Sequence, residues 1–389
     1  MKKIFSGIFI GTVLSTSNLM AKLPDFNLIY EGYLPEPISY NIEHVSYTME
    51  LKSANLLGNR QEFIVIKDTS IFKILQFVKK EWKTFYEITL NDSNSAKNTK
   101  WTTGDLNNDG KDEIILFKEQ SMIRYEWNGK EFEKTVNELP YLVGDALIGD
   151  VNNDNFKELV VFGEKNRGHK YYLCIIKAEK DSLHFLWTDN GELGYVNYNT
   201  SDKLVCIANV ENIHRKQLVI AKEQSDVSPT TYNLLMWNKN KLELTKSFIV
   251  AEGNIITKGH TEEPPFLLGH FKPIYIKGKE CFLGCVECAP DSLHPYSYFQ
   301  TVIFEMKNNF RILKALESNC CACANFETSV INLDGKGEGV MTLNSGQEDK
   351  FDDKTVPLTN TDEKVKKGHR ARKQGEKEPD YKTKYLFYR

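Results

Sequence analysis

An acidic segment that occurs twice in nearly the same form constrains the fold of this chain more than any other feature. The clearer copy spans residues 104–116 (GDLNNDGKDEIIL), and the second spans residues 149–161 (GDVNNDNFKELVV). Each copy joins a turn rich in Asp, Asn and Gly to a short apolar run typical of a buried strand. Such recurrence indicates a repeat architecture in which each copy marks one structural unit.

Weaker copies of the same pattern extend the repeat along the chain. They lie at residues 54–65, 208–219 and 331–338, with a sixth, strongly altered copy at 269–283. The spacing between copies is uneven, at roughly 45 to 60 residues, which is the range of propeller blades.

A hairpin is predicted after most copies, because apolar and polar residues alternate there as in half-buried strands. The predicted pairs are 72–78 with 82–88, 122–127 with 131–135, 172–176 with 183–187, 234–237 with 242–245, and 302–306 with 310–313. In the second pair, Asn128 and Gly129 suit a two-residue type I′ turn. Each unit therefore contains four strands with the acidic loop between the first and the second, as in a β-propeller blade.

The two ends of the chain are expected to meet in the last blade. That blade has candidate strands at 330–332, 340–343 and 384–389 but no fourth strand, and residues 26–32 form an unassigned strand near the N-terminus. Pairing the two ends closes the ring and hides the edges of an open sheet. We therefore expect an all-β protein with one propeller domain over residues 22–389, of six or alternatively seven four-stranded blades. The polar stretch at about 345–380 is predicted to be a solvated insertion.

The first 21 residues are typical of a secretory signal. Lys2 and Lys3 precede an apolar run, and small residues follow at Ser15, Ser17 and Ala21, so cleavage is expected after Ala21 or near Ser15–Ser17. No later apolar stretch has the 18 or so residues that a membrane-spanning helix needs. We expect an exported product, periplasmic or secreted. The formal net charge of −3 gives no field that favours nucleic acid.

The clearer acidic segment has the spacing of a loop that wraps oxygen atoms around Ca²⁺. Side chains that carry oxygen occupy loop positions one, three, five and nine: Asp105, Asn107, Asp109 and Glu113. Gly110 at position six permits the sharp turn, and the carbonyl of Lys111 adds a further oxygen. Leu116 stands at position twelve, where an EF-hand requires Glu, so the loop belongs to a different class.

These loops resemble the FG-GAP/VCBS repeats of integrin-like propellers and of many exported bacterial proteins. The resemblance implies a calcium-binding propeller with two ligand sets. They are Asp105, Asn107, Asp109, Lys111 and Glu113 in one loop, and Asp150, Asn152, Asp154, Phe156 and Glu158 in the other. The second loop departs from the pattern with Asn155 in place of Gly, which Asn tolerates because it adopts positive φ more readily than most residues.

The weaker copies are expected to form turns without metal. Ile213 stands at position five in one of them and Leu57 at position three in another, and neither side chain offers an oxygen atom. The copy at 331–338 keeps Asn332, Asp334 and Glu338, but in this alignment Val330 occupies position one.

Six cysteines cluster late in the chain: Cys281, Cys285, Cys288, Cys320, Cys321 and Cys323. In an oxidising compartment such a set most often forms disulfides, and six cysteines allow fifteen connectivities. The alternative is a Cys₄ zinc site built from Cys285, Cys288, Cys321 and Cys323. Cys174 and Cys206 lie on separate predicted strands, where buried free thiols are expected.

No catalytic motif identifies an enzyme. The chain lacks the patterns H-E-x-x-H and G-x-S-x-G. His294 near Asp291 and Tyr296 is one possible acid/base group, although a lone His beside a turn is usually only solvated. The sequence therefore favours a monomeric, calcium-binding, non-enzymatic binding or adhesion module for a protein or glycan ligand. The alternatives are a polysaccharide lyase or hydrolase and a structural component of the cell envelope.

Overall fold

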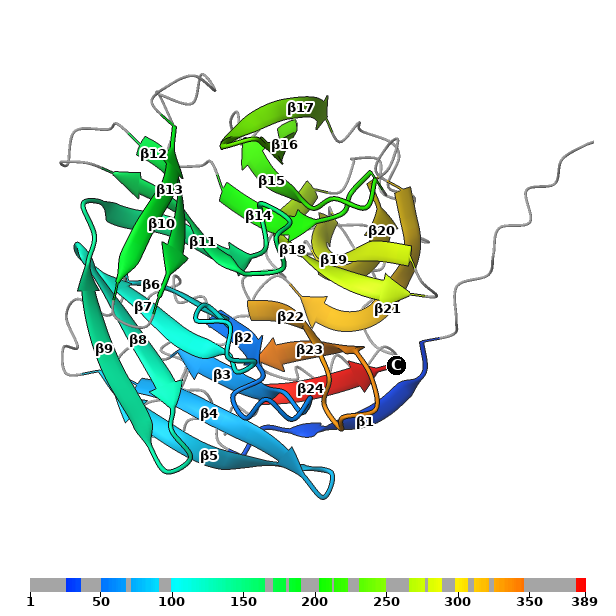
Figure 1. Ribbon diagram of the computed structural model, residues 1–389. Coiled ribbons are helices and arrows are strands. Elements are labelled where there is room, and N and C mark those ends of the chain that lie inside the picture. The colour runs from blue at the N-terminus through cyan, green and yellow to red at the C-terminus, as the bar shows by residue number, and fades with distance from the viewer. Residues whose placement is uncertain are drawn as a thin grey trace, which may run out of the picture.

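The computed structural model describes residues 26–35, 50–67, 71–90, 99–164, 171–179, 182–189, 203–211, 213–222, 231–249, 266–276, 279–288, 298–306, 311–321, 325–345 and 383–389. All regular elements in these residues are β-strands, so none is a helix able to cross a membrane. The strands form six antiparallel sheets of four. The predicted all-β propeller is confirmed, and it has six blades, the favoured number, and not the alternative seven (Figure 1).

Blades are numbered here by the position of their first strand in the chain. Blade 1 consists of β2 (Glu50–Ala54), β3 (Phe63–Lys67), β4 (Ile71–Val78) and β5 (Glu81–Thr89). Blade 2 consists of β6 (Lys100–Gly104), β7 (Glu113–Lys118), β8 (Ser121–Trp127) and β9 (Phe132–Glu138). Blade 3 consists of β10 (Leu142–Gly149), β11 (Glu158–Glu164), β12 (Tyr171–Ala178) and β13 (Leu183–Thr188).

The second half of the ring repeats this order of strands. Blade 4 consists of β14 (Lys203–Ala208), β15 (Gln217–Lys222), β16 (Thr231–Asn238) and β17 (Lys241–Ile249). Blade 5 consists of β18 (Phe266–Ile276), β19 (Lys279–Cys288), β20 (Tyr298–Glu305) and β21 (Arg311–Cys321). Blade 6 consists of β22 (Asn325–Ile331), β23 (Gly339–Ser345), β24 (Thr383–Tyr388) and β1 (Leu28–Tyr33).

The first strand of each blade contacts the first strand of the next blade, so that β2, β6, β10, β14, β18 and β22 form the inner wall of the ring (Figure 1). Small residues allow the inner strands to approach closely. A Cβ atom on Gly149 of β10 would lie 2.9 Å from the side chain of Ile207 of β14, closer than normal packing permits. The Gly that precedes the acidic turn in the second copy is therefore a packing residue.

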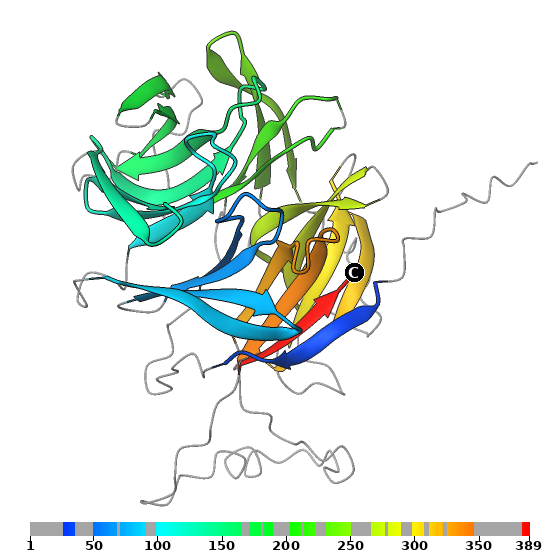
Figure 2. The ribbon, with the colours of Figure 1, turned by 60° about the horizontal axis from the view of Figure 1, so that its bottom comes forward.

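The ends of the chain close the ring as predicted. Strand β1 is antiparallel to β24, and Leu28 lies opposite Tyr388. The backbones of Asn27 and Arg389 also exchange two hydrogen bonds, of 3.2 and 3.1 Å. Figure 2 shows β1 in dark blue beside β24 in red. The outermost strand of blade 6 thus comes from the opposite end of the sequence from its three partners.

The hydrophobic core lies between adjacent blades, where aromatic side chains fill the wedge-shaped space. Phe85 of blade 1 packs on Trp127 of blade 2, with ring centroids 4.9 Å apart. Phe77 of blade 1 meets Tyr385 of blade 6 edge to face at 6.3 Å. Such contacts exclude water from the interface and give each blade a neighbour against which to bury its apolar face.

All five predicted hairpins are confirmed, but the predicted type I′ turn is wrong. Trp127 pairs with Phe132, so the connection contains four residues instead of two. The side chain of Asn128 accepts hydrogen bonds from the backbone amides of Lys130 and Glu131, both at 2.9 Å. This side-chain turn takes the place of the backbone conformation that the dipeptide suggested.

The altered copy at residues 269–283 contains no acidic loop. Its first residues belong to β18, which runs on to Ile276 past a register shift between Leu268 and Lys272, and β19 begins at Lys279. Three other predictions lie outside the described residues: the leader at 1–21, the insertion after Ser345, and the group of Asp291, His294 and Tyr296.

Candidate metal centre

The loop between the first two strands has one backbone design in five of the six blades. Loop positions are counted from the residue after the inner strand, so that Asp105 is position one in blade 2. Position four has positive φ where it is described, at Gly58, Asn108, Asn153 and Gly335. Position six has positive φ at Arg60, Gly110, Asn155, His214 and Gly337. The turn at position six was predicted from the sequence, whereas the turn at position four was missed, although only Asn and Gly occur there.

The β6–β7 loop turns its side-chain oxygens inward toward its own backbone amides. The carboxylate of Asp105 accepts hydrogen bonds from the amides of Asp109 (3.0 Å) and Gly110 (3.1 Å). Asn107 Oδ1 also accepts from the Asp109 amide at 3.0 Å, and Asp109 Oδ1 accepts from the Lys111 amide at 2.9 Å. Positions one, three and five therefore face the same centre.

Glu113 completes this cluster from the first residue of β7. Its side chain is fully buried, with 0% of its surface exposed, and its Oε2 accepts a hydrogen bond of 2.8 Å from the Leu106 amide. Its Oε1 has no hydrogen-bond partner in the described part of the chain. Carboxylate oxygens of Asp105, Asp109 and Glu113 all lie within 4.8 Å of one another. An arrangement of this kind is stable only with a proton or a cation among the carboxylates.

Burial raises the pKa of Glu113 to about 8, although the Leu106 amide and the charge of Arg124 act in the opposite direction. The cause is desolvation, because a buried carboxylate loses its hydration and becomes harder to ionise. The four side chains at positions one, three, five and nine could hold a divalent cation, together with the carbonyl of Lys111. The side chain of Lys111 is turned to Asp109, with Nζ 3.8 Å from Oδ2.

The β10–β11 loop repeats this design. Asp150 accepts hydrogen bonds from the amides of Asp154 (3.1 Å) and Asn155 (3.2 Å), and Asn155 adopts a φ of 73° as expected. Glu158 is also 0% exposed, with Oε2 bonded to the Val151 amide at 3.0 Å and Oε1 without a partner among the described residues. Burial raises its pKa to about 7. The side chains of each predicted ligand set thus lie in one loop, and within the described residues the β6–β7 set is the one whose three carboxylates approach within 4.8 Å of one another.

The β14–β15 loop shows how a loop of this design remains satisfied without a cation. Gln217 replaces Glu at position nine and is fully buried. Its amide nitrogen donates a hydrogen bond of 2.8 Å to Glu211 Oε2, and its Oε1 accepts from the Glu211 amide at 3.2 Å. An amide therefore satisfies both atoms that a carboxylate leaves half-satisfied in blades 2 and 3. Ile213 lies 43% exposed at position five, which agrees with a turn that holds no ion.

The alignment of the last copy needs a correction of two residues. Val330 lies within β22, and Asn332 is the first residue after that strand. The Gly337 amide donates to Asn332 Oδ1 at 3.1 Å, as the Gly110 amide does to Asp105, so Asn332 occupies position one. Position nine is then Val340, not Glu338. The apolar residue at position two, here Leu333, is the better marker of register because it is fully buried.

A residue at position eight, or Glu280 near the start of β19 in blade 5, links five of the blades to the loop of the preceding blade in the ring. In three cases an acidic side chain accepts a hydrogen bond from the backbone amide at position one. These acidic clasps are Asp112 to Asn55 (2.7 Å), Glu280 to Asn209 (2.9 Å) and Glu62 to Asn332 (2.9 Å). Two loops use a lysine clasp, in which the backbone amide at position eight bonds to Asn at position four. The lysine clasps are Lys157 to Asn108 (2.9 Å) and Lys216 to Asn153 (2.6 Å).

The type of clasp correlates with the charge at position one. Position one is Asn beneath every acidic clasp and Asp beneath both lysine clasps, at Asp105 and Asp150. An acid above an aspartate would repel it, whereas a lysine compensates its charge. This pairing was visible in the sequence but could be interpreted only after the blades were placed side by side.

The described cysteines do not form the single group of six that was predicted to make disulfides. Cys174, Cys206 and Cys281 are buried free thiols, as predicted for the first two, so Cys281 stands apart from the predicted disulfide group. Cys288 and Cys321 both lie opposite Tyr298, one on either side of β20. Their Cα atoms are therefore about 10 Å apart, two strand spacings, which is too far for a disulfide between them. Cys323 lies outside the described residues.

Comparison with protein-family models finds no match, and no curated protein matches the sequence. Solved structures resemble the fold at low identity. A lectin of Agrocybe aegerita that recognises non-reducing terminal N-acetylglucosamine has a TM-score of 0.42 and 12% identity, over 78% of each chain. AofleA from Arthrobotrys oligospora has a TM-score of 0.45 and 12% identity, over 82% of this chain and 83% of that one. BBS1N in complex with ARL6DN has a TM-score of 0.41 and 10% identity, over 82% and 93%. At such identities the similarity concerns the fold alone.

Proposed function

We propose that this chain is an exported, calcium-binding β-propeller with blades of the FG-GAP/VCBS type, and that it acts as a non-enzymatic binding module for a protein or glycan. The observation that supports calcium is the environment of Glu113. Its buried Oε1 has no partner among the described residues and lies in one cluster with the carboxylates of Asp105 and Asp109. The basic and apolar residues at the N-terminus support export.

Calcium fits this loop better than other common cations do. All the ligand atoms offered are oxygens, from three carboxylates, one amide and the backbone carbonyl of Lys111. Calcium accepts six to eight oxygen ligands in a flexible geometry, whereas zinc prefers nitrogen and sulfur and magnesium requires a near-ideal octahedron. Bound calcium would neutralise the cluster and satisfy Glu113. Because Asp105, Asp109 and Glu113 would then all be ligands and Asp112 is bonded to Asn55, the ion would stabilise the blade and not activate a substrate.

The binding role is supported by the architecture and by the resemblance of the acidic loops to repeats used in adhesion. A propeller holds its loops on a rigid ring, and loops on a rigid scaffold are common recognition sites. Calcium would act on this role indirectly. It would hold the β6–β7 loop in one conformation and so reduce the entropy lost when a ligand binds.

The calcium proposal is tested by thermal unfolding of the mature protein with calcium and with a chelator. Wild type should unfold at a higher temperature in calcium, because an ion that binds only the native state stabilises it by mass action. The Asp105→Ala/Asp109→Ala double variant should lose this shift. The matched Asn55→Ala/Asn59→Ala variant alters the same loop positions in blade 1 and should keep it. Equal calcium shifts in wild type and the Asp105/Asp109 variant would refute the assignment.

The binding role is tested by capture. The mature protein, immobilised in calcium, is exposed to an envelope extract and to a polysaccharide panel, and bound material is eluted with a chelator. A specific protein or glycan released by chelation supports a calcium-dependent module. A polysaccharide shortened during incubation would instead identify an enzyme, and a partner retained in fixed stoichiometry despite chelation would identify a structural component.

A further inference from the structure

We propose that the β10–β11 loop carries its own counter-cation, the ammonium group of Lys216, and that of the two acidic loops only β6–β7 takes a calcium ion. The inference rests on the proposed calcium binding and narrows it to one loop. Lys216 makes the β10–β11 loop a latent site, which has the same ligand types but an ammonium group beside Asp150.

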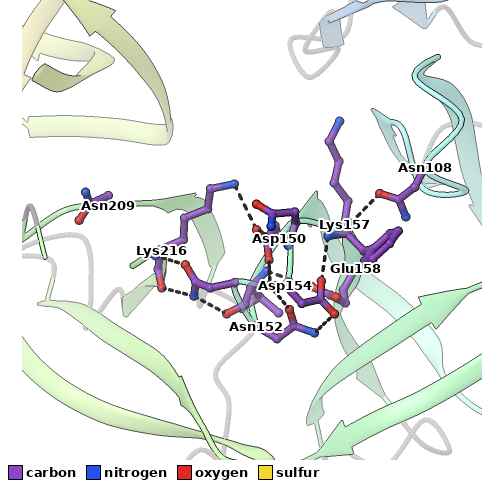
Figure 3. Close-up of polar contacts among 12 residues, drawn as sticks. Asn108, Asp150, Asn152, Asp154, Lys157, Glu158, Asn209 and Lys216 are labelled. Carbon is purple, nitrogen blue, oxygen red and sulfur yellow. Dashed lines mark hydrogen bonds and ion pairs between the residues drawn. The ribbon is translucent and has the colours of Figure 1, made fainter. Parts of the chain in front are cut away.

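Lys216 is held directly over the β10–β11 loop. Its Nζ lies 3.8 Å from Asp150 Oδ2, and the Asp150 side chain is only 9% exposed beneath it (Figure 3). The backbone of Lys216 is fixed at the same place, because its amide bonds to Asn153 Oδ1 at 2.6 Å and its carbonyl lies 3.4 Å from Asn153 Nδ2. The lysine clasp therefore fixes the backbone from which the half-exposed Lys216 side chain reaches Asp150.

The lysine clasp above the β6–β7 loop has the same backbone hydrogen bond, but the side chain of its lysine extends to a different carboxylate. Lys157 bonds through its amide to Asn108 Oδ1, as Lys216 does to Asn153. Its Nζ, however, lies 3.8 Å from Asp112 Oδ1, at position eight of the β6–β7 loop itself. In the β10–β11 loop, position eight is Lys157, so no acid is present there to attract Lys216. The charge at position eight of a loop thus decides where the lysine of the next blade goes.

The two loops also differ in charge at an equivalent position on the third strand of each blade. The residue opposite position nine on the third strand differs between the two blades. Tyr125 pairs with Ile114, so Glu126 lies opposite Glu113 in blade 2, and Ile176 pairs with Leu159, so Lys177 lies opposite Glu158 in blade 3. Glu126 Oε2 accepts a hydrogen bond of 3.2 Å from Asn107 Nδ2 and so turns this amide group away from Asp109. Lys177 cannot accept, and its Nζ lies over the ring of Phe156 at 5.1 Å.

The consequence appears at position five. Without an outside acceptor, Asn152 Nδ2 donates its hydrogen bond of 3.1 Å to Asp154 Oδ2 inside the loop (Figure 3). One carboxylate oxygen of the second ligand set is thereby occupied. Within the described residues, the carboxylates that come together as a three-membered cluster are those of the β6–β7 loop.

Three equivalent positions around the two loops also differ in charge. They are position eight of the loop, the third-strand residue opposite position nine, and position eight of the next blade. Around the β6–β7 loop they are two acids and one lysine, namely Asp112, Glu126 and Lys157. Around the β10–β11 loop they are three lysines, namely Lys157, Lys177 and Lys216. Each loop has one ammonium group 3.8 Å from a ligand carboxylate, Lys111 at Asp109 and Lys216 at Asp150. Solvent screens the first pair more, because Asp109 is 34% exposed and Asp150 only 9%. A divalent cation would therefore be repelled more strongly from the β10–β11 loop, so calcium prefers the first loop.

The test is the number of calcium ions bound by the metal-stripped mature protein, measured by isothermal titration and by equilibrium dialysis at neutral pH. Wild type should bind one ion in these two loops, and Lys216→Gln should bind a second. Lys216→Arg keeps the positive charge and should still bind one. Lys157→Gln is the matched control, because its ammonium group already lies on Asp112, and it should also bind one ion.

Further variants assign each ion to its loop. Glu113→Gln should remove the ion of wild type, and Glu158→Gln should remove only the ion gained by Lys216→Gln. Two ions in wild type, or one ion that Asp150→Asn abolishes and Asp105→Asn leaves, would overturn the inference. If wild type binds none and Lys216→Gln binds one, the role of Lys216 stands while calcium at the β6–β7 loop fails. No ion in either protein overturns both proposals. Unchanged circular dichroism of each variant in chelator verifies that it has folded.

Discussion

A buried carboxyl group that lacks a partner for one oxygen destabilises a folded chain, and the described residues include two such groups at equivalent positions of neighbouring blades. Glu113 and Glu158 are both fully buried, and each receives backbone hydrogen bonds at Oε2 while Oε1 has no partner in the described part of the chain. Gln217 occupies the same position in blade 4 with both of its polar atoms bonded. The protein therefore contains its own comparison between an acidic and a neutral loop.

Replacing Glu113 by Gln should separate the destabilisation caused by its buried carboxyl group from the stabilisation that this group provides as a calcium ligand. In chelator, Glu113→Gln should stabilise the protein by about 1 to 2 kcal/mol, because an unsatisfied buried acidic group is removed. In calcium, the variant should be less stable than wild type, since a ligand is lost. Urea unfolding under both conditions measures the two effects. A variant destabilised equally with and without calcium would show that Glu113 serves packing alone.

At the scale of the element, the clasps connect five of the six neighbouring pairs of blades through their loops. Each lysine clasp needs an Asn at position four, because this residue must adopt positive φ and also offer a side-chain acceptor. Asn108 has a φ of 59° and accepts from the Lys157 amide at 2.9 Å. Gly could meet the first requirement but not the second, and Ala meets neither well.

Two variants of Asn108 distinguish these requirements. Asn108→Gly should lower the free energy of unfolding by about 1 kcal/mol through loss of the inter-blade hydrogen bond. Asn108→Ala should cost about 1 kcal/mol more, because Ala is strained in the left-handed region. Urea unfolding provides the measurement, and the same pair of changes at Asn153 is the replicate in the next blade. Equal stability of the Gly variant and wild type would show that the clasp contributes nothing.

At the scale of the whole molecule, the ring depends on contacts between the two ends of the chain. Tyr30 of β1 packs between Phe77 of blade 1 and Phe387 of blade 6, with centroids at 5.1 and 6.0 Å. Tyr30→Ala should therefore destabilise the protein by about 2 kcal/mol, whereas Tyr30→Phe keeps the ring and should change stability little. Thermal and urea unfolding measure both. An Ala variant as stable as wild type would mean that β1 is dispensable for closure.

The same closure should depend on pH through Glu62, the acidic clasp between blades 1 and 6. Burial raises its pKa to about 7, against a bonded Asn332 amide that lowers it and the charges of Asp112 and Glu338 that raise it further. The unfolded chain releases this proton near pH 4.5 and the native protein near pH 7. Between these values the native state binds more protons, so stability contributed by Glu62 falls as pH rises.

Glu62→Gln should flatten this dependence while keeping an oxygen acceptor for the Asn332 amide. In chelator, the difference in unfolding free energy between variant and wild type should grow in favour of the variant from pH 5 to pH 7.5, by about 1 to 2 kcal/mol after solvent screening. Parallel stability curves for the two proteins would refute the shifted pKa of Glu62.

The sequence alone determined the blade, because a blade is built from local signals. Alternating strands, turns rich in Asp, Asn and Gly, and apolar runs recur within a few tens of residues. They predicted the hairpins, the first two acidic loops, six as the favoured number of blades and the strand that closes the ring. The same local signals failed at Asn128, which is compatible with two types of turn. They also failed at the last loop, where Val330 was aligned in place of Asn332 because the buried Leu333 was not used to set the register.

Tertiary structure decided everything that depends on one blade lying against the next. Lys216 lies 66 residues after Asp150 and Lys157 lies 45 residues after Asp112, and only ring geometry brings each lysine to 3.8 Å from its aspartate. Two acidic loops with equal ligand sets thereby acquire different charge environments. Ligand spacing is a property of the local sequence, whereas the field at a binding site is a sum over all neighbours, which only the folded ring defines.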